Sequence, residues 1–333
     1  MKKVLRIFAI ILIVLAVCIT GLLTYVKVGL PNVGAAPEIK IKPTPELVAR
    51  GEYLANHVNV CMDCHSTRDW TRFSGPVVPG TMGKGGERFG EELGLPGVYY
   101  ARNITPAGLG EWTDGEIFRA ISAGVSREGK PLFPLMPHPY YGKMDSTDIV
   151  ALVAYLRTIK PIKNQVPESE PSFPMNFIIH TIPQKPTFQK RPDTSDVVAY
   201  GAYLVNAGTC EHCHSQKTKE GKLIPGMEFA GGVEFGLPTG VLRSANLTPD
   251  NETGLGLWSR EAFIQRFKAH DPATGYQAQT VKSAEQQTIM PWTMYSGMSE
   301  HDLGAIYSYL KTLKPVKNPT VRFSPAKSEI AHK

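Results

Sequence analysis

Residues 61–65 read Cys-Met-Asp-Cys-His, and residues 210–214 read Cys-Glu-His-Cys-His. In both stretches two cysteines stand three positions apart, and a histidine follows the second cysteine directly. On a helical turn, residues three and four apart share a face, so two thiols and an imidazole can converge on one group. The two stretches therefore predict the same chemistry at two places in the chain.

This spacing is typical of covalent haem c attachment, in which the thiols form thioethers to the macrocycle and the imidazole ligates the iron. Cys-x-x-Cys pairs also occur in disulfides and zinc sites, but neither requires the histidine that follows in both stretches. We therefore predict two haem c groups. The residues expected to bind them are Cys61, Cys64, His65, Cys210, Cys213 and His214.

The second axial ligand of each iron is expected to be a methionine. Met136 and Met290 each precede a proline at corresponding places, and a thioether is a soft ligand suited to low-spin haem iron. Met144 and Met298 are also duplicated, but they stand beside predicted helix starts and are interpreted as core residues. His138, close to Met136, is a rival ligand for the first iron.

The two motifs lie within a repeat that covers most of the chain. Residues 51–56 (Gly-Glu-Tyr-Leu-Ala-Asn) recur as residues 201–206 (Gly-Ala-Tyr-Leu-Val-Asn). Asn-Ile-Thr-Pro at 103–106 recurs as Asn-Leu-Thr-Pro at 246–249, and a tryptophan follows each copy. One architecture is therefore built twice. We expect a transmembrane segment at 1–28, domains at 40–162 and 195–318, and a Pro-rich connector at 163–194.

The predicted fold class is mainly α with long loops, since apolar residues recur at helical spacing between stretches rich in glycine and proline. Gly51 and Gly201 let another backbone approach closely, and we expect the terminal helix bearing Tyr155 or Tyr309 to pack there. Helices are expected at residues 45–57, 113–123, 146–159, 196–207 and 300–313. Capping pairs are expected at Thr113 with Glu116, Asp145 with Asp148, and Ser299 with Asp302.

Several polar residues stand in apolar surroundings, and buried polar groups need partners. Haem propionates and loop scaffolding are both open as those partners. The residues concerned are Asn103, Thr105, Trp112, Asn246, Thr248 and Trp258. Arg102 and Arg243 could also neutralise propionates. The histidines without a repeated counterpart are expected at the surface or hydrogen-bonded, namely His57, His180, His212, His270 and His301.

Residues 7–26 carry no charged side chain, and at about 1.5 Å per residue they can span a hydrocarbon layer of roughly 30 Å. Lys2, Lys3 and Arg6 precede them, which favours an N-terminus in the cytoplasm. A cleaved signal peptide is the alternative, but its apolar core is usually about 7 to 15 residues. We expect a single-pass anchor in a bacterial inner membrane, with the haem domains on the periplasmic side. Cys18 is expected as an apolar filler in this anchor.

The composition is that of a folded protein, with 42% hydrophobic and 20% charged residues. The formal charge of +6 is too small, with much of it at the N-terminus, to argue for nucleic acid. In the connector, the apolar residues 173–179 are expected to lie against one or both domains.

Residues 271–288 form a polar insertion without a match in the first repeat. We expect this insertion either to shield a haem edge or to meet a partner.

At the haem motifs, the Asn-x-Thr-Pro segments and the Met-Pro pairs, the sequence resembles the dihaem two-domain class I cytochromes c. That group includes cytochrome subunits of bacterial membrane-bound dehydrogenases. The resemblance implies two tandem cytochrome c domains with covalent haem at the cysteines and axial ligation by His65 with Met136 and by His214 with Met290. Many of those dehydrogenase subunits carry three haems, whereas this chain has two motifs.

The leading hypothesis is electron transfer outside the cytoplasm without catalysis. The redox partner would be a dehydrogenase, a quinol-linked complex or a terminal oxidase. An enzyme, either a dihaem peroxidase or a sulfur-compound oxidoreductase, is the alternative, and it would need one haem that opens to substrate. A sensor or structural role is a third possibility, which no feature of the sequence favours.

Overall fold

The computed structural model describes residues 1–218 and 221–326, and most of its regular structure is helical. We call residues 40–194 the first half and the described residues of 195–326 the second half. The helices before the second half are α1 Lys2–Gly29, α2 Pro45–Tyr53, α3 Cys61–Cys64, α4 Pro106–Leu109, α5 Asp114–Ala123, α6 His138–Tyr141, α7 Ser146–Thr158 and α8 Met175–Ile178. Those of the second half are α9 Val197–Ala207, α10 Cys210–His214, α11 Arg260–Lys268, α12 Trp292–Tyr295 and α13 Glu300–Leu310.

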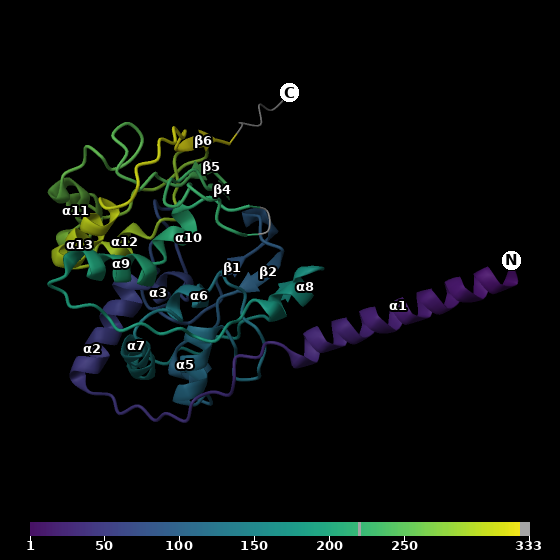
Figure 1. Cartoon of the computed structure of the whole chain (residues 1–333). Helices are drawn as coiled ribbons and strands as arrows, with labels where there is room; N and C mark the ends of the chain where they lie inside the picture. Colours follow the sequence, from purple (N-terminus) through teal and green to yellow (C-terminus); the bar gives the residue numbers. More distant parts are fainter. Residues whose placement is uncertain (219–220, 327–333) are drawn as a thin grey trace, which may run out of the picture.

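Helix α1 projects from the body formed by the two halves (Figure 1). None of its residues is buried, and its mean hydropathy reaches 3.0, so it is long and apolar enough to cross a membrane. A helix of this kind near the N-terminus suggests a membrane anchor or a signal sequence. Cys18 is exposed on it, as an apolar filler of an anchor would be.

The five helices predicted from periodicity are present, and the capping box at Thr113 with Glu116 is formed on both sides. Of the other two predicted pairs, Ser299 with Asp302 is formed on one side only, and Asp145 with Asp148 is wrong, because Asp145 accepts from the Thr147 N–H instead. Asp145 and Ser299 do cap their helices through their side chains. However, the Asp148 and Asp302 carboxylates turn inward instead of reaching back to the cap, because each is taken by buried partners described below.

Helix α2 continues into a π-helical turn, η1 at Leu54–Val58, which has no counterpart in the regular helix α9. The sequence explains the difference, because one residue more separates Asn56 from Cys61 than Asn206 from Cys210. A π turn accommodates a single inserted residue inside an α-helix. The insertion therefore leaves the start of each cysteine turn in the same place relative to its helix.

Helix pairs α2 with α7 and α9 with α13 form the framework of the two halves. A Cβ at Gly51 would overlap the Ala151 carbonyl, and a Cβ at Gly201 would overlap the Ala305 carbonyl. The side chains of Tyr155 and Tyr309 lie beside the same two glycines. The predicted close approach of the terminal helices is therefore confirmed in both halves.

Two small antiparallel sheets were missed by the sequence analysis. Their strands are β1 Arg88–Phe89, β2 Gly97–Tyr100 and β3 Glu170–Pro171 in the first half, and β4 Glu234–Leu237, β5 Gly240–Arg243 and β6 Phe323–Pro325 in the second. β3 comes from the connector, pairing Gly97 with Pro171, and β6 lies beyond residue 318, pairing Gly240 with Pro325. Each half thus extends past the boundary expected from the repeat.

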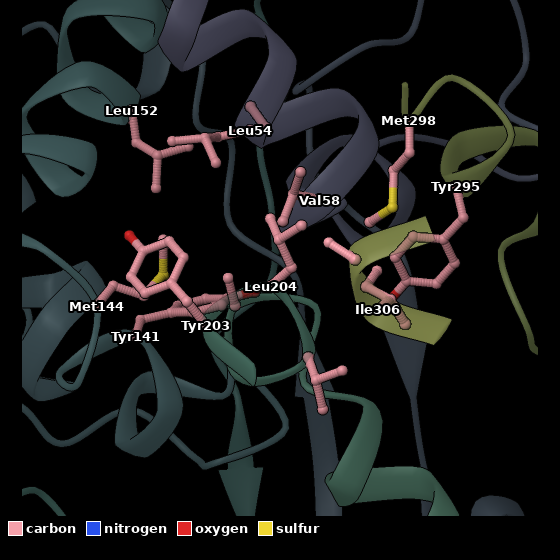
Figure 2. Packing of buried hydrophobic residues seen from close by; sticks show 14 of the residues in the cluster. Leu54, Val58, Tyr141, Met144, Leu152, Tyr203, Leu204, Tyr295, Met298 and Ile306 are labelled. Atoms are coloured by element: carbon pink, nitrogen blue, oxygen red, sulfur yellow. The ribbon is translucent and has the colours of Figure 1, made fainter. Parts of the chain in front are cut away.

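One hydrophobic core runs through both halves (Figure 2). Leu54 and Leu204 occupy equivalent places in it and have no exposed surface. Met144 and Met298 are buried in the same cluster, as expected for core methionines. Figure 2 shows Leu152, Leu54, Val58 and Ile306 following one another between the halves. The halves therefore share apolar surface instead of meeting through a polar contact alone.

Buried tyrosine–carboxylate hydrogen bonds are exchanged between the halves. Tyr53 of the first half donates to Asp302 of the second at 2.7 Å, and Tyr203 of the second donates to Asp148 of the first at 2.6 Å. These tyrosines are equivalent in the repeat, and so are the two aspartates. The contact between the halves is therefore reciprocal, like the contact between the two subunits of a symmetric homodimer.

Backbone groups complete this reciprocal contact. The Tyr53 and Tyr203 hydroxyls also accept the backbone N–H groups of Ser299 and Asp145, respectively. The backbone carbonyls of Tyr140 and Met294 are also equivalent in the repeat, and each is bound by the other half. The Asn206 amide donates to the Tyr140 carbonyl at 3.0 Å, and the His57 ring lies 2.9 Å from the Met294 carbonyl oxygen. A different residue type thus serves the same position on the two sides, because of the extra residue in η1.

Tyr53→Phe and Tyr203→Phe each remove a hydrogen bond to a buried carboxylate, and bonds to charged groups contribute about 1.5 to 3 kcal/mol. We expect each variant to lower the free energy of unfolding by that amount in urea denaturation followed by circular dichroism. Tyr307→Phe is the control, because its hydroxyl donates to the Trp258 carbonyl at an exposed position. A loss no larger than that of the control would contradict a stabilising role for the exchange.

Candidate functional site

Both cysteine motifs form a single helical turn, α3 in the first half and α10 in the second. The residue before each turn is β-branched and left-handed, with φ 47° at Val60 and 53° at Thr209. Such a conformation is strained for a β-branched residue and is found mostly where function requires it. Because both motifs begin after a residue with this strained backbone conformation, we infer that the fold fixes the direction of each helical turn.

The two histidines of the motifs are held in the same way. His65 Nδ1 lies 2.7 Å from the carbonyl oxygen of Arg102, and His214 Nδ1 lies 2.8 Å from that of Ala245. This bond fixes the ring and leaves Nε2 as the nitrogen able to bind a metal. Burial lowers the pKa of His65 and brings that of His214 to about 4, so both rings are neutral, which is the ligating form.

Neither pair of motif cysteines is joined as a disulfide. Burial raises the pKa of Cys61, Cys64 and Cys210 to about 12 and that of Cys213 to about 11. Redox-active Cys-x-x-Cys pairs have lowered thiol pKa values instead. Within residues 1–218 and 221–326, no three His, Cys, Asp or Glu side chains are grouped as metal ligands.

Tyrosines tie each Met-Pro loop to the cysteine turn of its own half. Tyr141, at the end of the short helix that follows Met136, donates to the carbonyl of Asn59 at 3.0 Å. In the second half Tyr295 donates to the carbonyl of Gly208 at 2.9 Å. Burial and then the nearby motif thiols raise the pKa of both tyrosines well above its usual value.

The Met136 and Met290 side chains are partly buried and pack against the shared core. In both loops the second residue after the methionine donates its backbone N–H to the methionine carbonyl, at 2.7 Å from His138 and 2.8 Å from Trp292. The structure thus brings each predicted methionine loop to the cysteine motif of its own half. Tyr141 and Tyr295 were not predicted from the sequence, although their duplication in the repeat is a usable signal.

His138 differs between the halves, since Trp292 occupies its place in the second. It is buried, with 1% of its surface exposed, and burial lowers its pKa to about 4. Its Nε2 atom has no hydrogen-bond partner among the described residues. His138 as a rival ligand stays a prediction.

The duplicated Asn-x-Thr pairs of the repeat are loop scaffolds. Asn103 Oδ1 accepts from both the backbone and the hydroxyl of Thr105, and its amide donates to the Ile162 carbonyl. Asn246 and Thr248 repeat this arrangement on the carbonyl of Val316. Loop scaffolding thus accounts for their polar groups, and the loops carry the carbonyls that hold His65 and His214.

Arg102 and Arg243 use their guanidinium groups at the surface, where Arg102 pairs with Glu168 and Arg243 with Glu234. Arg102 acts on the site through its backbone carbonyl, a role that any residue can fill. The histidines without repeated counterparts all have polar partners, as expected. The contacts are His57 with Met294, His180 with Leu30, His212 with Lys217, His270 with Arg266 and His301 with Asp302.

The unmatched insertion binds the first half. Val281 and Phe73 donate backbone hydrogen bonds to Thr71 and Gln279, which places residues 279–281 beside residues 71–73. The buried Gln287 amide donates to the carbonyls of Trp70 and Arg72 and its oxygen accepts from the backbone of Ser74. The insertion, residues 271–288, therefore binds the second half to the first, and we call it the clasp. Its shielding of a haem edge or contact with a partner stays a prediction.

This clasp reaches Met290. The Ser74 hydroxyl donates to the Met290 carbonyl at 2.6 Å and accepts from the backbone N–H of Trp292 at 3.1 Å. Ser74 is buried and left-handed, with φ 68°. A residue of the first half thus holds the predicted ligand loop of the second. No sequence pattern marks this role, because it depends on which loops the fold brings together.

The chain has relatives among proteins of known function. It is 28% identical over 289 residues to the "Alcohol dehydrogenase (quinone), cytochrome c subunit" of Gluconacetobacter polyoxogenes, which covers 81% of the chain and 56% of the relative. The "Gluconate 2-dehydrogenase cytochrome c subunit" of Pantoea cypripedii is 29% identical, with 80% and 59% covered. The chain is homologous to c-type cytochromes. No protein-family model matches it.

A third relative, the "Diheme cytochrome c-type" of Cereibacter sphaeroides, is 25% identical over 298 residues and covers 83% of the chain and 92% of the relative. By contrast, the chain spans little more than half the length of the dehydrogenase cytochrome subunits. The homology to c-type cytochromes supports a haem c protein of electron transport.

The residues in each half fit a covalently held haem. Each half supplies two cysteine thiols on one helical turn and a neutral imidazole whose Nδ1 is fixed by a carbonyl. A methionine loop is tied by a tyrosine to the segment before that turn. These are the donor groups that haem c uses, two for the macrocycle and two for the iron.

Ser74→Ala should loosen the Met290 loop, because it removes the two hydrogen bonds of the hydroxyl to the Met290 carbonyl and the Trp292 N–H, each worth about 0.5 to 1.5 kcal/mol. Hydrogen exchange followed by mass spectrometry should show faster exchange at residues 288–295. Ser122→Ala is the matched control, since that equally buried hydroxyl donates to the Phe118 carbonyl within α5. Equal exchange of residues 288–295 in the two variants would contradict the clasp.

Proposed function

We propose that this chain is a membrane-anchored dihaem cytochrome that relays electrons on the extracytoplasmic side of a bacterial inner membrane. One haem c is attached at Cys61 and Cys64 and the other at Cys210 and Cys213. The axial pairs are His65 with Met136 and His214 with Met290. The two tandem cytochrome c domains correspond to the two halves, and α1 is the single-pass anchor.

The equivalence of the two sites is the observation that carries this proposal. Each half has the same strained entry to the cysteine turn, the same carbonyl on the histidine ring and the same tyrosine between the Met-Pro loop and that turn. Electron transfer needs two irons that keep their ligands during the redox cycle. An enzyme of the peroxidase kind instead needs one site that opens to substrate, and it would be expected to differ between the halves.

Contacts across the interface support transfer between the two haems. The Asn59 amide, two residues before Cys61, donates to the Ala207 carbonyl at 3.1 Å. Tyr140, which follows the Met136 loop, donates to Glu211 within the second cysteine motif at 3.2 Å. These contacts place the segments that lead into the two attachment turns close to one another. When bound, the haems supply the one-electron chemistry, and the chain holds them in fixed mutual positions.

A dehydrogenase is the proposed electron donor. Support comes from relatives whose names place them as cytochrome subunits of alcohol and gluconate dehydrogenases. The chain itself would then be a non-catalytic subunit, and the two-motif chain would pass electrons onward to a membrane quinone-linked complex or a terminal oxidase.

Met136→His and Met290→His should each lower the reduction potential of one haem and leave the reduction potential of the other haem unchanged. The expected change is on the order of 0.1 V, a fraction of the roughly 0.8 V that axial ligands span, because the thioether is lost. A spectroelectrochemical titration of the haem-loaded full chain measures this. Met144→Leu and Met298→Leu serve as controls, since both are core residues. Potentials unchanged in the histidine variants would reject the assigned ligands.

A further inference from the structure

An apolar segment of the connector lies beside the base of α1 and is only partly covered by protein. Helix α8 and the following short turn η3, Ile179–Thr181, contact α1, as Figure 1 shows near the point where α1 leaves the body. Phe173 is 80% exposed and Ile178 is 44% exposed, whereas Ile179 is buried. The apolar stretch thus packs against the rest of the protein at Ile179, as expected, but leaves Phe173 and Ile178 exposed.

Two contacts fix the level of this segment along α1. The Lys27 ammonium lies 4.8 Å from the centre of the Phe177 ring, and His180 Nδ1 donates a hydrogen bond to the Leu30 carbonyl at 3.1 Å. Lys27 is the first charged residue after the apolar stretch of α1. The segment thus stands where a spanning helix would leave the hydrocarbon layer.

The segment is held firmly enough to present a defined surface. Its entry strand β3 pairs with β2, and Ser172 donates to the Pro96 carbonyl at 3.0 Å. Asn176 then donates to the carbonyl of Ser172 at 3.0 Å, which closes the turn that carries Phe173. The Phe173 and Phe177 rings meet edge to face, with centres 6.4 Å apart. The exposed Phe173 ring and the partly buried Phe177 ring therefore belong to a turn anchored on the sheet of the first half.

We propose that Phe173, Phe177 and Ile178 enter the boundary between lipid headgroups and acyl chains, as a second membrane contact beside α1. Aromatic side chains favour this layer, and an exposed apolar patch next to a spanning helix matches it. A basic residue at the same level suits the headgroups. The contact would hold the first half, and through the rigid interface both halves, at a fixed tilt to the membrane. This inference rests on the anchor part of the proposed function.

Spin labelling of the full chain in vesicles of phosphatidylcholine and phosphatidylglycerol tests the contact. A nitroxide is attached at Phe173→Cys in a Cys18→Ser background, and its accessibility to oxygen and to a water-soluble nickel complex is measured by electron paramagnetic resonance with both irons reduced. Leu257→Cys is the matched control, since Leu257 is also 80% exposed. We expect the oxygen-to-nickel ratio to be several-fold higher at residue 173 than at residue 257.

Equal ratios at residues 173 and 257 would overturn the inference, and so would protection of residue 173 from nickel without a gain in oxygen, which indicates a protein contact. Ile178→Cys is read in parallel, so that a folding defect of one variant leaves the test intact. A label at Val14→Cys reports on α1 itself. A lipid-like Val14 with a water-like residue 173 refutes only this contact, whereas a water-like Val14 refutes the anchor.

Discussion

The buried carboxylates Asp148 and Asp302 impose the arrangement on which both sites depend. A carboxylate removed from water needs partners that neutralise or hydrogen-bond it, and breaking a buried pair is costly. Asp148 is 1% exposed and is bound by Arg50 of its own half, by Arg191 of the connector and by Tyr203 of the other half. The Asp148 carboxylate keeps all three of these partners in only one relative position of the two halves.

That position is reinforced by a shared apolar core and by the clasp at Ser74, and the segments that lead into the two cysteine turns are held in contact. An arrangement of this kind suits a relay, because electrons pass between fixed groups without a moving part. The halves are not identical, however. The extra residue in η1 and His138 are found only in the first half, and the insertion that forms the clasp is found only in the second. These differences give each site its own surroundings within one scaffold.

Much of this could be predicted from local sequence. The five long helices follow from apolar spacing, and Gly51 and Gly201 followed from their place in the repeat. Asp148 and Asp302 were misread as capping residues, because a helix-start pattern does not reveal that a tyrosine from the other half competes for the carboxylate. The strands were missed because each is only two to four residues long and depends on partners far away in the chain. The carbonyls of Arg102 and Ala245 carry no side-chain signature at all.

Near-infrared magnetic circular dichroism of the oxidised full chain, referred to its iron content, addresses the two His/Met sites most directly. The sulfur-to-iron charge-transfer signal reports thioether ligation of low-spin haem. The account predicts this signal at both irons of every chain. Its absence from both irons, or a colourless protein in which the four motif thiols remain free, would contradict it.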